Sequence, residues 1–257
     1  MIKSIHKATA LLSILADSKG EPVTLADLSV LSGINKSTCA HIISTLEADG
    51  YAVKISSSKG YIIGPAAYCL SRFGRYKDGL ISVCRPFMKY LYSTTGYSVI
   101  LAILEGDTKY IIDYIDDGRI FDTKTKIRID DIYRTATGRV MLSNLTEDRL
   151  FSIYKKYGLP DSDEWPKFSD FNDFCKYILA KKSEKILRCR GINDTGTKIN
   201  IGYATAIYNN VSCIGSLGVA VCISPDEEKN FLRDEEKIKR LLIQCTNQIN
   251  RQLSSQL

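Results

Sequence analysis

Residues 24–46 contain two short predicted helices joined by a tight turn, and this spacing constrains the fold more than any other feature of the chain. Thr24 can cap the first helix, with Asp27 three residues later in a variant of the capping box. Gly33 can end that helix because glycine adopts a positive φ at low cost, and Asn35 can cap the next helix. Two helices at this spacing are typical of a helix-turn-helix, although an ordinary helical hairpin has the same pattern.

The second of these helices has an apolar face and a polar face. Its apolar positions recur at i, i+3, i+4 and i+7, the spacing of a core-facing stripe, and they are Cys39, Ile42, Ile43 and Leu46. The opposite face carries a cation, small hydroxyl groups and an imidazole, which can contact phosphates and base edges without blocking entry to a groove. The DNA-reading residues predicted on this face are Lys36, Ser37, Thr38, His41 and Thr45.

A predicted β-hairpin follows the second helix. Residues 51–55 and 61–63 are expected to form its strands around a polar turn. A hairpin in this position is typical of a winged helix, and it would bring Lys54 and Lys59 near phosphates. Residues 1–64 hold six Lys and Arg against five Asp and Glu, so they generate no strong basic field. Binding of DNA is therefore expected to require a homodimer or a larger assembly.

Ahead of this motif, the N-terminal residues are expected to form an amphipathic helix. Ile5, Ala8, Leu12 and Leu15 fall at i, i+3, i+7 and i+10, the spacing of one helix face, and Ser4 can cap this helix. The basic start followed by a short apolar run also mimics a signal peptide. The helical spacing and the lack of a small-x-small cleavage motif favour the helix, so we expect a cytoplasmic protein.

The cysteines and histidines do not indicate a metal site. No two of the eight cysteines have C-x-x-C spacing, and the chain holds only two histidines, which offers too few ligands for a structural zinc site. Dispersed cysteines are typical of reduced packing residues in a cytosolic protein. No uninterrupted apolar stretch approaches the roughly 18 residues of a membrane span, so we expect no membrane partner.

The chain also lacks catalytic and cofactor motifs. It contains no G-x-S-x-G, Walker or G-x-G-x-x-G sequence, so no cofactor is predicted. Cys39 and His41 cannot form a nucleophile–base pair, because residues two apart on a helix diverge by roughly 200°. The carboxylate clusters near residues 113–117 and 130–131 fit solvated turns better than acid–base catalysis. We therefore predict that the protein is not an enzyme.

The remainder of the chain predicts a second, larger domain. The 257 residues suit one large domain or two ordinary ones, and a hydrophobic share of 44% supports a buried core. Gly64-Pro65 is expected to start a helix, and further helices are expected near 85–92, 137–157, 170–187 and 227–253. Strands are expected near 97–104, 109–114, 199–207 and 211–223, the last two turning at Asn209-Asn210. Strands paired as hairpins with helices between them imply an α+β fold on an antiparallel sheet.

Several segments of the first 65 residues have the order and spacing of a known kind of DNA-binding domain. They are Leu25-Ala26-Asp27-Leu28, Ser32-Gly33-Ile34-Asn35-Lys36-Ser37-Thr38, Ser44-Thr45-Leu46-Glu47, Asp49-Gly50-Tyr51 and Tyr61-Ile62-Ile63-Gly64-Pro65. In these segments the chain resembles the winged helix of the IclR-type bacterial transcription regulators. That family usually has arginine where this chain has His41, which implies a weaker contact there and a different operator preference.

The resemblance covers nearly the whole chain. The last hairpin also occupies its expected place, as do Arg85-Pro86, Glu105-Gly106-Asp107, Ala136-Thr137-Gly138-Arg139 and Arg190-Gly191. The resemblance implies a winged helix-turn-helix DNA-binding domain at 1–64, a linker helix at 65–80 and a GAF-like effector-binding domain at 81–257.

A ligand site is expected where Ala136-Thr137-Gly138 opens a helix. Backbone N–H groups at a helix start attract an anion, which favours a small organic acid, although the segment also fits a plain strand-to-helix turn. The resemblance adds the effector-binding positions Asn193, Gly202, Gly218 and Ala220. The last three stand where the family often has cysteine or serine, which implies a more apolar effector, a different one, or none.

We therefore expect a ligand-responsive, sequence-specific DNA-binding transcriptional regulator, and specifically a repressor of a catabolic operon. Its expected partners are a double-stranded DNA operator, a small-molecule effector and further copies of the chain, in a homodimer or homotetramer. The helix at 64–75 is the expected dimer contact. A second hypothesis is a small-molecule-binding or protein-interaction module whose winged helix no longer binds DNA.

Overall fold

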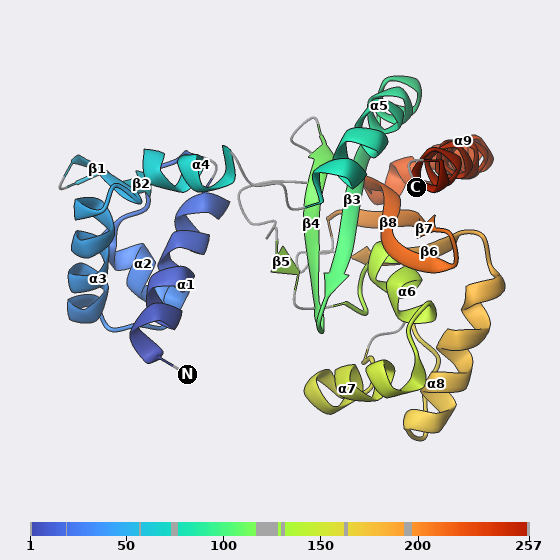
Figure 1. The fold of residues 1–257 in the computed structure, drawn as a ribbon, viewed down its shortest axis with the longest axis horizontal. Helices are drawn as coiled ribbons and strands as arrows, with labels where there is room; N and C mark the ends of the chain where they lie inside the picture. Colours follow the sequence, from blue (N-terminus) through green and yellow to red (C-terminus); the bar gives the residue numbers. More distant parts are fainter. Residues whose placement is uncertain are drawn as a thin grey trace. The chain divides into compact units, whose positions relative to one another are not determined.

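The computed structural model describes residues 2–18, 20–56, 58–72, 77–116, 128–129, 132–161, 164–192 and 197–255. These residues form two compact units. The described residues up to 72 belong to the first unit, and those from 77 onward belong to the second. Figure 1 labels the helices and strands of each unit and colours them by their position in the chain.

The first unit consists of helices around a small core, followed by a two-stranded hairpin. Its elements are α1 (Lys3–Asp17), α2 (Leu25–Ser32), α3 (Lys36–Ala48), β1 (Ala52–Ser56), β2 (Gly60–Ile63) and α4 (Pro65–Arg72). Strands β1 and β2 pair antiparallel. Helices α1, α2 and α3 pack together around Leu11, Leu15, Leu28, Cys39, Ile43 and Leu46. The predicted helix-turn-helix and its following hairpin are confirmed.

The predicted caps of α2 and α3 are also confirmed. The Thr24 hydroxyl oxygen accepts a hydrogen bond from the Asp27 N–H at 3.2 Å, and Asn35 Oδ1 accepts one from the Thr38 N–H at 2.8 Å. Gly33 adopts φ +67 between the two helices, a left-handed conformation that glycine adopts without a steric penalty. These contacts satisfy N–H groups that have no partner inside their own helices.

Helix α1 differs from its prediction in which residues it buries. Ile5 is 59% exposed, whereas Leu11 and Leu15 are fully buried. Ile5 lies six residues before Leu11, and six residues place two side chains about 120° apart around an α-helix. Ser4 lies inside α1 and does not cap it.

The second unit is built on a six-stranded sheet in which every neighbouring pair is antiparallel. The strand order is β5-β4-β3-β8-β7-β6. The strands are β3 (Ser98–Glu105), β4 (Thr108–Ile115), β5 (Arg128–Ile129), β6 (Leu187–Ile192), β7 (Ile199–Asn209) and β8 (Ser212–Ile223). The helices are α5 (Asp78–Thr95), α6 (Ala136–Ser143), α7 (Glu147–Tyr157), α8 (Phe171–Ala180), η1 (Lys181–Ser183), η2 (Pro225–Glu227) and α9 (Glu228–Ser254).

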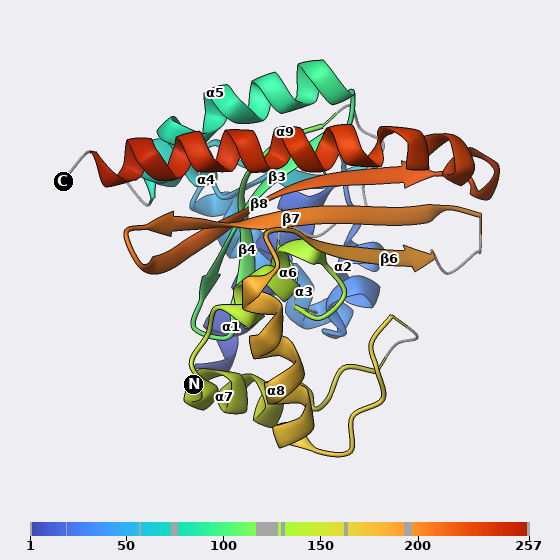
Figure 2. The same cartoon turned by 90° about the vertical axis from the view of Figure 1, so that its right-hand side faces the viewer.

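Helices cover both faces of this sheet (Figure 2). Helices α5 and α9 lie side by side on one face, above a core that includes Leu91, Leu101, Leu217 and Leu242. Helix α6 lies on the other face, where Ala136 and Val140 pack against Leu187, Cys189 and Ala204. Helices α7 and α8 enclose a separate cluster around Trp165 and Phe174. The predicted α+β class on an antiparallel sheet is confirmed.

The single helix predicted near 137–157 is two helices. Helix α6 ends at Ser143 and α7 begins at Glu147. The Asn144 side chain donates a hydrogen bond to the Val140 carbonyl at 2.8 Å. An asparagine that bonds a helix carbonyl in this way competes with the next backbone N–H, which favours a helix end.

The helix predicted near 170–187 ends at Ala180, and the unpredicted strand β6 begins at Leu187. Leu187 and Cys189 are buried while Arg188 is exposed, the alternation expected of a strand with one covered face. The predicted hairpin turn is confirmed, and Asn210 adopts φ +55 within it.

A backbone bridge fixes the hairpin of the first unit to its helices. Val23, in the loop between α1 and α2, exchanges two backbone hydrogen bonds with Tyr61 of β2, at 2.8 and 2.9 Å. Gly60 precedes Tyr61 with φ +99, and a Cβ there would lie 2.2 Å from the Val23 carbonyl oxygen. The bridge therefore requires glycine at this position.

Gly60→Ala is expected to destabilise the first unit by about 3 kcal/mol, because the methyl group combines left-handed strain with a backbone clash. Gly20→Ala is the matched control. Gly20 has φ +94, but nothing lies within 4 Å of a Cβ there, so this variant should lose only about 1 kcal/mol. Urea unfolding measures both, and equal losses would show that the Val23 contact does not hold the hairpin.

Candidate nucleic-acid interface and ligand site

Helix α3 places most of the predicted reading residues in solvent. Lys36, Ser37, His41 and Thr45 are exposed, and Thr38 is half-buried. The opposite face is anchored in the core by Cys39, Ile43 and Leu46. The Thr45 hydroxyl donates to the His41 carbonyl at 3.1 Å, which leaves its oxygen able to accept. The helix therefore combines a buried apolar face with a polar face open to a partner.

The hairpin follows α3 directly and carries the two predicted lysines. The Tyr51 N–H donates to the Leu46 carbonyl at 2.7 Å, so the chain turns from α3 straight into β1. Lys54 and Lys59 are both exposed. The Lys54 ammonium lies 5.8 Å from the centre of the Tyr61 ring, a cation–π contact that orients it. The hairpin therefore adds two cations to the unit that contains α3.

The predicted ligand residues of the second unit meet at the start of α6. Thr135 caps this helix, its hydroxyl oxygen accepting the Gly138 N–H at 3.1 Å. Cys189 Sγ, on β6, accepts the Ala136 N–H at 3.1 Å. Ala136 and Thr137 are 4% and 5% exposed. Two of the first N–H groups of α6 are therefore bonded within the protein.

Two glycines of the sheet allow α6 to pack this closely. A Cβ at Gly202 of β7 would lie 2.9 Å from Cys189 Sγ. A Cβ at Gly218 of β8 would lie 2.8 Å from Thr137 Cγ2. Both distances are shorter than a nonbonded contact permits, so these two predicted effector-binding positions lie directly beneath the first turn of the helix.

The other predicted ligand positions differ in how they relate to this turn. A Cβ at Gly138 would lie 2.0 Å from the Ile132 carbonyl oxygen, so glycine lets the incoming chain pass close to α6. Ala220 is half-buried and pairs with Gly202 in the register of β7 and β8. Asn193 lies outside the described residues.

Lys109 belongs to this cluster, although the sequence did not point to it. The residue is 1% exposed, and its ammonium donates to Thr135 Oγ1 at 2.7 Å and to Thr137 Oγ1 at 3.3 Å. A lysine in a strand is ordinarily expected to reach solvent. Its spacing could have indicated burial, because Lys109 lies two residues before Ile111 and alternate residues of a strand share one face. Both side chains are buried on β4.

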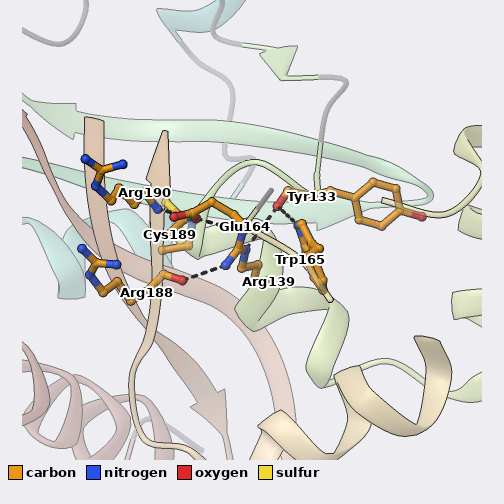
Figure 3. Close-up of polar contacts among 8 residues, drawn as sticks. Tyr133, Arg139, Glu164, Trp165, Arg188, Cys189 and Arg190 are labelled. Carbon is orange, nitrogen blue, oxygen red and sulfur yellow. Dashed lines mark hydrogen bonds and ion pairs between the residues drawn. The ribbon is translucent and has the colours of Figure 1, made fainter. Parts of the chain in front are cut away.

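Arg139, in the first turn of α6, connects this helix to two other segments (Figure 3). Its guanidinium donates to the Arg188 carbonyl at 3.0 Å, to the Tyr133 carbonyl at 3.3 Å and to Glu164 Oε2 at 3.1 Å. The guanidinium also lies 4.6 Å from the centre of the Trp165 ring. One side chain thus joins the loop before α8 to α6 and to β6.

These contacts also protect the free edge of the sheet, because β6 is its last strand. Glu164 Oε2 accepts the Arg190 N–H, and Arg139 bonds the Arg188 carbonyl. The side chains therefore occupy backbone groups that an open edge would offer to another chain. The Arg190 guanidinium makes two hydrogen bonds to the Glu228 carboxylate, at 2.8 and 3.0 Å, which lower the pKa of Glu228.

The cysteines are free, and most are packed inside the protein. Burial raises the pKa of the Cys84 thiol to about 12 and also raises that of Cys189. Within the described ranges, no three or more His, Cys, Asp or Glu residues gather closely enough to hold a metal ion. None of the helices described is both long enough and apolar enough to span a membrane.

Two family models match the chain. Residues 4–56 match the IclR helix-turn-helix domain, and residues 76–162 match the C-terminal domain of the bacterial transcriptional regulator IclR. The regulator TtgV of Pseudomonas putida is 29% identical over 58% of this chain and 57% of its own length. The acetate operon repressor of Salmonella typhimurium is 22% identical over 62% of this chain and 58% of its own. The chain thus spans less than two thirds of each relative.

Solved structures share the whole fold. An IclR homolog from Microbacterium hydrocarbonoxydans, complexed with 4-hydroxybenzoate, superposes with a TM-score of 0.70 at 13% identity, covering 98% of this chain and 99% of its own. The regulator from Alicyclobacillus acidocaldarius superposes with a TM-score of 0.68 at 16% identity, covering 99% and 98%. At these identities the likeness concerns the fold alone.

Arg139→Lys is expected to destabilise the second unit by about 2 kcal/mol, since lysine keeps the charge but cannot reproduce the directed contacts of the guanidinium. Trp165 is the one tryptophan of the chain and is buried, so its emission should shift to longer wavelength as the loop loosens. Arg149→Lys is the control, because Arg149 is exposed and donates to the Gly106 carbonyl. Identical unfolding midpoints for the two variants would contradict a bridging role.

Proposed function

The chain belongs to the IclR family of bacterial transcriptional regulators, and on this basis we propose that it is a ligand-responsive, sequence-specific DNA-binding protein. We propose further that it represses a catabolic operon in the cytoplasm and catalyses no reaction. The observation that carries the proposal is the polar face of α3. Lys36, Ser37 and His41 are exposed there while the other face of the helix is buried.

The same face argues against a winged helix that no longer binds DNA. Its exposed groups are a lysine, hydroxyls and an imidazole, and such groups suit phosphates and base edges. Lys54 and Lys59 of the hairpin supply further cations. A helix retained only to support the fold would not need this combination.

We propose that the protein acts as a homodimer joined through α4, or as a homotetramer made of two such dimers. One reading unit with nearly balanced charge neutralises few phosphates, so two units on neighbouring half-sites would supply the missing affinity. On α4, Tyr68 and Leu70 are 67% and 69% exposed. Large apolar side chains exposed on a short helix offer surface that a partner can cover.

We propose that a small organic acid binds at the start of α6. The positive end of the helix dipole and the ammonium of Lys109 meet there. Gly202, Gly218 and Ala220 contribute no polar side chains, which favours an acid with an apolar body. Because the relative from Microbacterium hydrocarbonoxydans was solved with 4-hydroxybenzoate, this aromatic acid is the first effector to test.

Lys36→Ala is expected to weaken binding to every DNA duplex and to lower the slope of log Kd against log salt by about 1, because one phosphate contact is lost. His41→Ala should instead change the preference among sequences. Lys167→Ala is the control, since Lys167 is exposed in the second unit. Fluorescence anisotropy across a salt series measures all three, and an unchanged slope for Lys36→Ala would place the reading surface elsewhere.

Thr137→Val is expected to weaken binding of 4-hydroxybenzoate by about 1 kcal/mol, because valine keeps the shape but removes the hydroxyl. DNA affinity without the acid should stay the same. Isothermal titration calorimetry measures the acid, and Thr146→Val is the control, because Thr146 is exposed before α7 and its side chain makes no cap hydrogen bond. Equal affinity in Thr137→Val and the parent chain would move the effector site away from α6.

A further inference from the structure

A polar cavity lies at the opposite end of α6 from the effector site proposed above. Its volume is about 210 Å³, and it is bounded by the end of α6, by η1, by β7 and by α9. Its polar lining includes Ser143, Asn144, Lys182, Lys185, Thr246 and Asn247. Every one of these residues belongs to the second unit.

The cavity exists because β6 covers only part of β7. Strand β6 pairs with residues 199–204, whereas β7 continues to Asn209. Residues 205–209 therefore pair with β8 on one side but have no strand on the β6 side of the described sheet. Asn250 Oδ1 of α9 accepts the Tyr208 N–H at 2.9 Å, and Asn144 Oδ1 accepts the Tyr208 hydroxyl at 2.7 Å. The unpaired end of β7 is thus held by Asn250 of α9 and by Asn144, which follows α6, and the cavity lies between these elements.

Neutral hydrogen-bonding groups line the interior of this hollow. Thr246 is 3% exposed, and its hydroxyl has no hydrogen-bond partner among the described residues. A buried polar group ordinarily has a partner, and leaving it unsatisfied costs free energy. Asn247, the next residue of α9, adds an amide to the lining. The interior therefore suits an occupant with hydroxyl groups.

The rim of the cavity is positively charged. Lys182 and Lys185 are exposed, and no hydrogen bond or ion pair joins either ammonium to a described residue. Glu184 lies between them but is paired with Lys181 at 2.6 Å. A shallower groove of about 570 Å³ continues from Lys185 along α9 and adds Arg240. An acidic group of a ligand would be attracted to this rim.

From this arrangement we propose that the cavity binds a small hydroxylated acid, meaning a molecule with several hydroxyl groups and one carboxylate or phosphate. One hydroxyl group bonds the buried Thr246, another bonds the exposed amide of Asn247, and the acidic group lies at the rim beside Lys182 and Lys185. An apolar ligand would leave the Thr246 hydroxyl without a partner. An inorganic anion would leave most of the interior unfilled.

Isothermal titration calorimetry on the full chain tests this proposal. The probes are D-gluconate and glucose 6-phosphate, with glucose and inorganic phosphate as partial ligands that carry only one of the two features. We expect saturable binding of at least one hydroxylated acid, and about tenfold weaker binding of each partial ligand. A preference for gluconate or for glucose 6-phosphate supports the proposal in either case and identifies the acidic group.

Three variants locate the binding. Thr246→Val keeps the shape, and it should weaken binding of the preferred acid about fivefold. Joint substitution Lys182→Gln and Lys185→Gln should remove the preference for the acid over glucose. The matched pair Lys167→Gln and Lys176→Gln, exposed lysines outside the lining, should not. If Thr246→Val fails to fold, the two lysine pairs still decide the question.

Three results would overturn the proposal. The first is no saturable binding of either hydroxylated acid. The second is binding of inorganic phosphate as tight as that of glucose 6-phosphate, because the hydroxyl groups would then contribute nothing. The third is a loss of acid binding in Thr137→Val but not in Thr246→Val, which would place the acid at the proposed effector site. Failure of this second site would leave the proposed regulator function intact, since DNA binding is measured separately.

Discussion

The second unit depends on how closely the first turn of α6 approaches the sheet. Gly202 and Gly218 have no Cβ, and this absence lets Cys189 Sγ and the Thr137 methyl group occupy the space above the strands. The approach brings Cys189 to the Ala136 N–H. A side chain at either glycine would lift the helix and break that hydrogen bond. Two missing methyl groups therefore set where the helix begins and which groups meet there.

The same approach gathers positive charge at the start of α6. The ammonium of Lys109 is buried beside Thr135 and Thr137, and the positive end of the helix dipole points to the same place. An anion bound there would be stabilised by both the helix and the ammonium. The ammonium and the helix dipole together are thus the physical basis of the proposed acid site.

The first unit was predictable because its contacts are local. Thr24 bonds Asp27 and Asn35 bonds Thr38, each three residues along the chain, so spacing alone reveals them. The ligand cluster of the second unit is different: Cys189 meets Ala136 across 53 positions. Such pairs follow from sheet order, which no local pattern specifies. Strand β6 was not predicted, because Arg188 and Arg190 gave this short edge strand the polar composition expected at the end of a helix.

Helix α6 connects the proposed acid site at its start with the cavity at its end. Its eight residues span about 12 Å, so a shift at one end moves the other. Arg139 resists such a shift, since it holds α6 to β6 and to Glu164. A ligand alters this balance only if it binds two positions of the helix with different affinity. An acid at the start of α6 and a hydroxylated acid at its end would therefore act on one rigid body. Each then changes the affinity for the other by the same factor, because coupling between two binding sites is reciprocal.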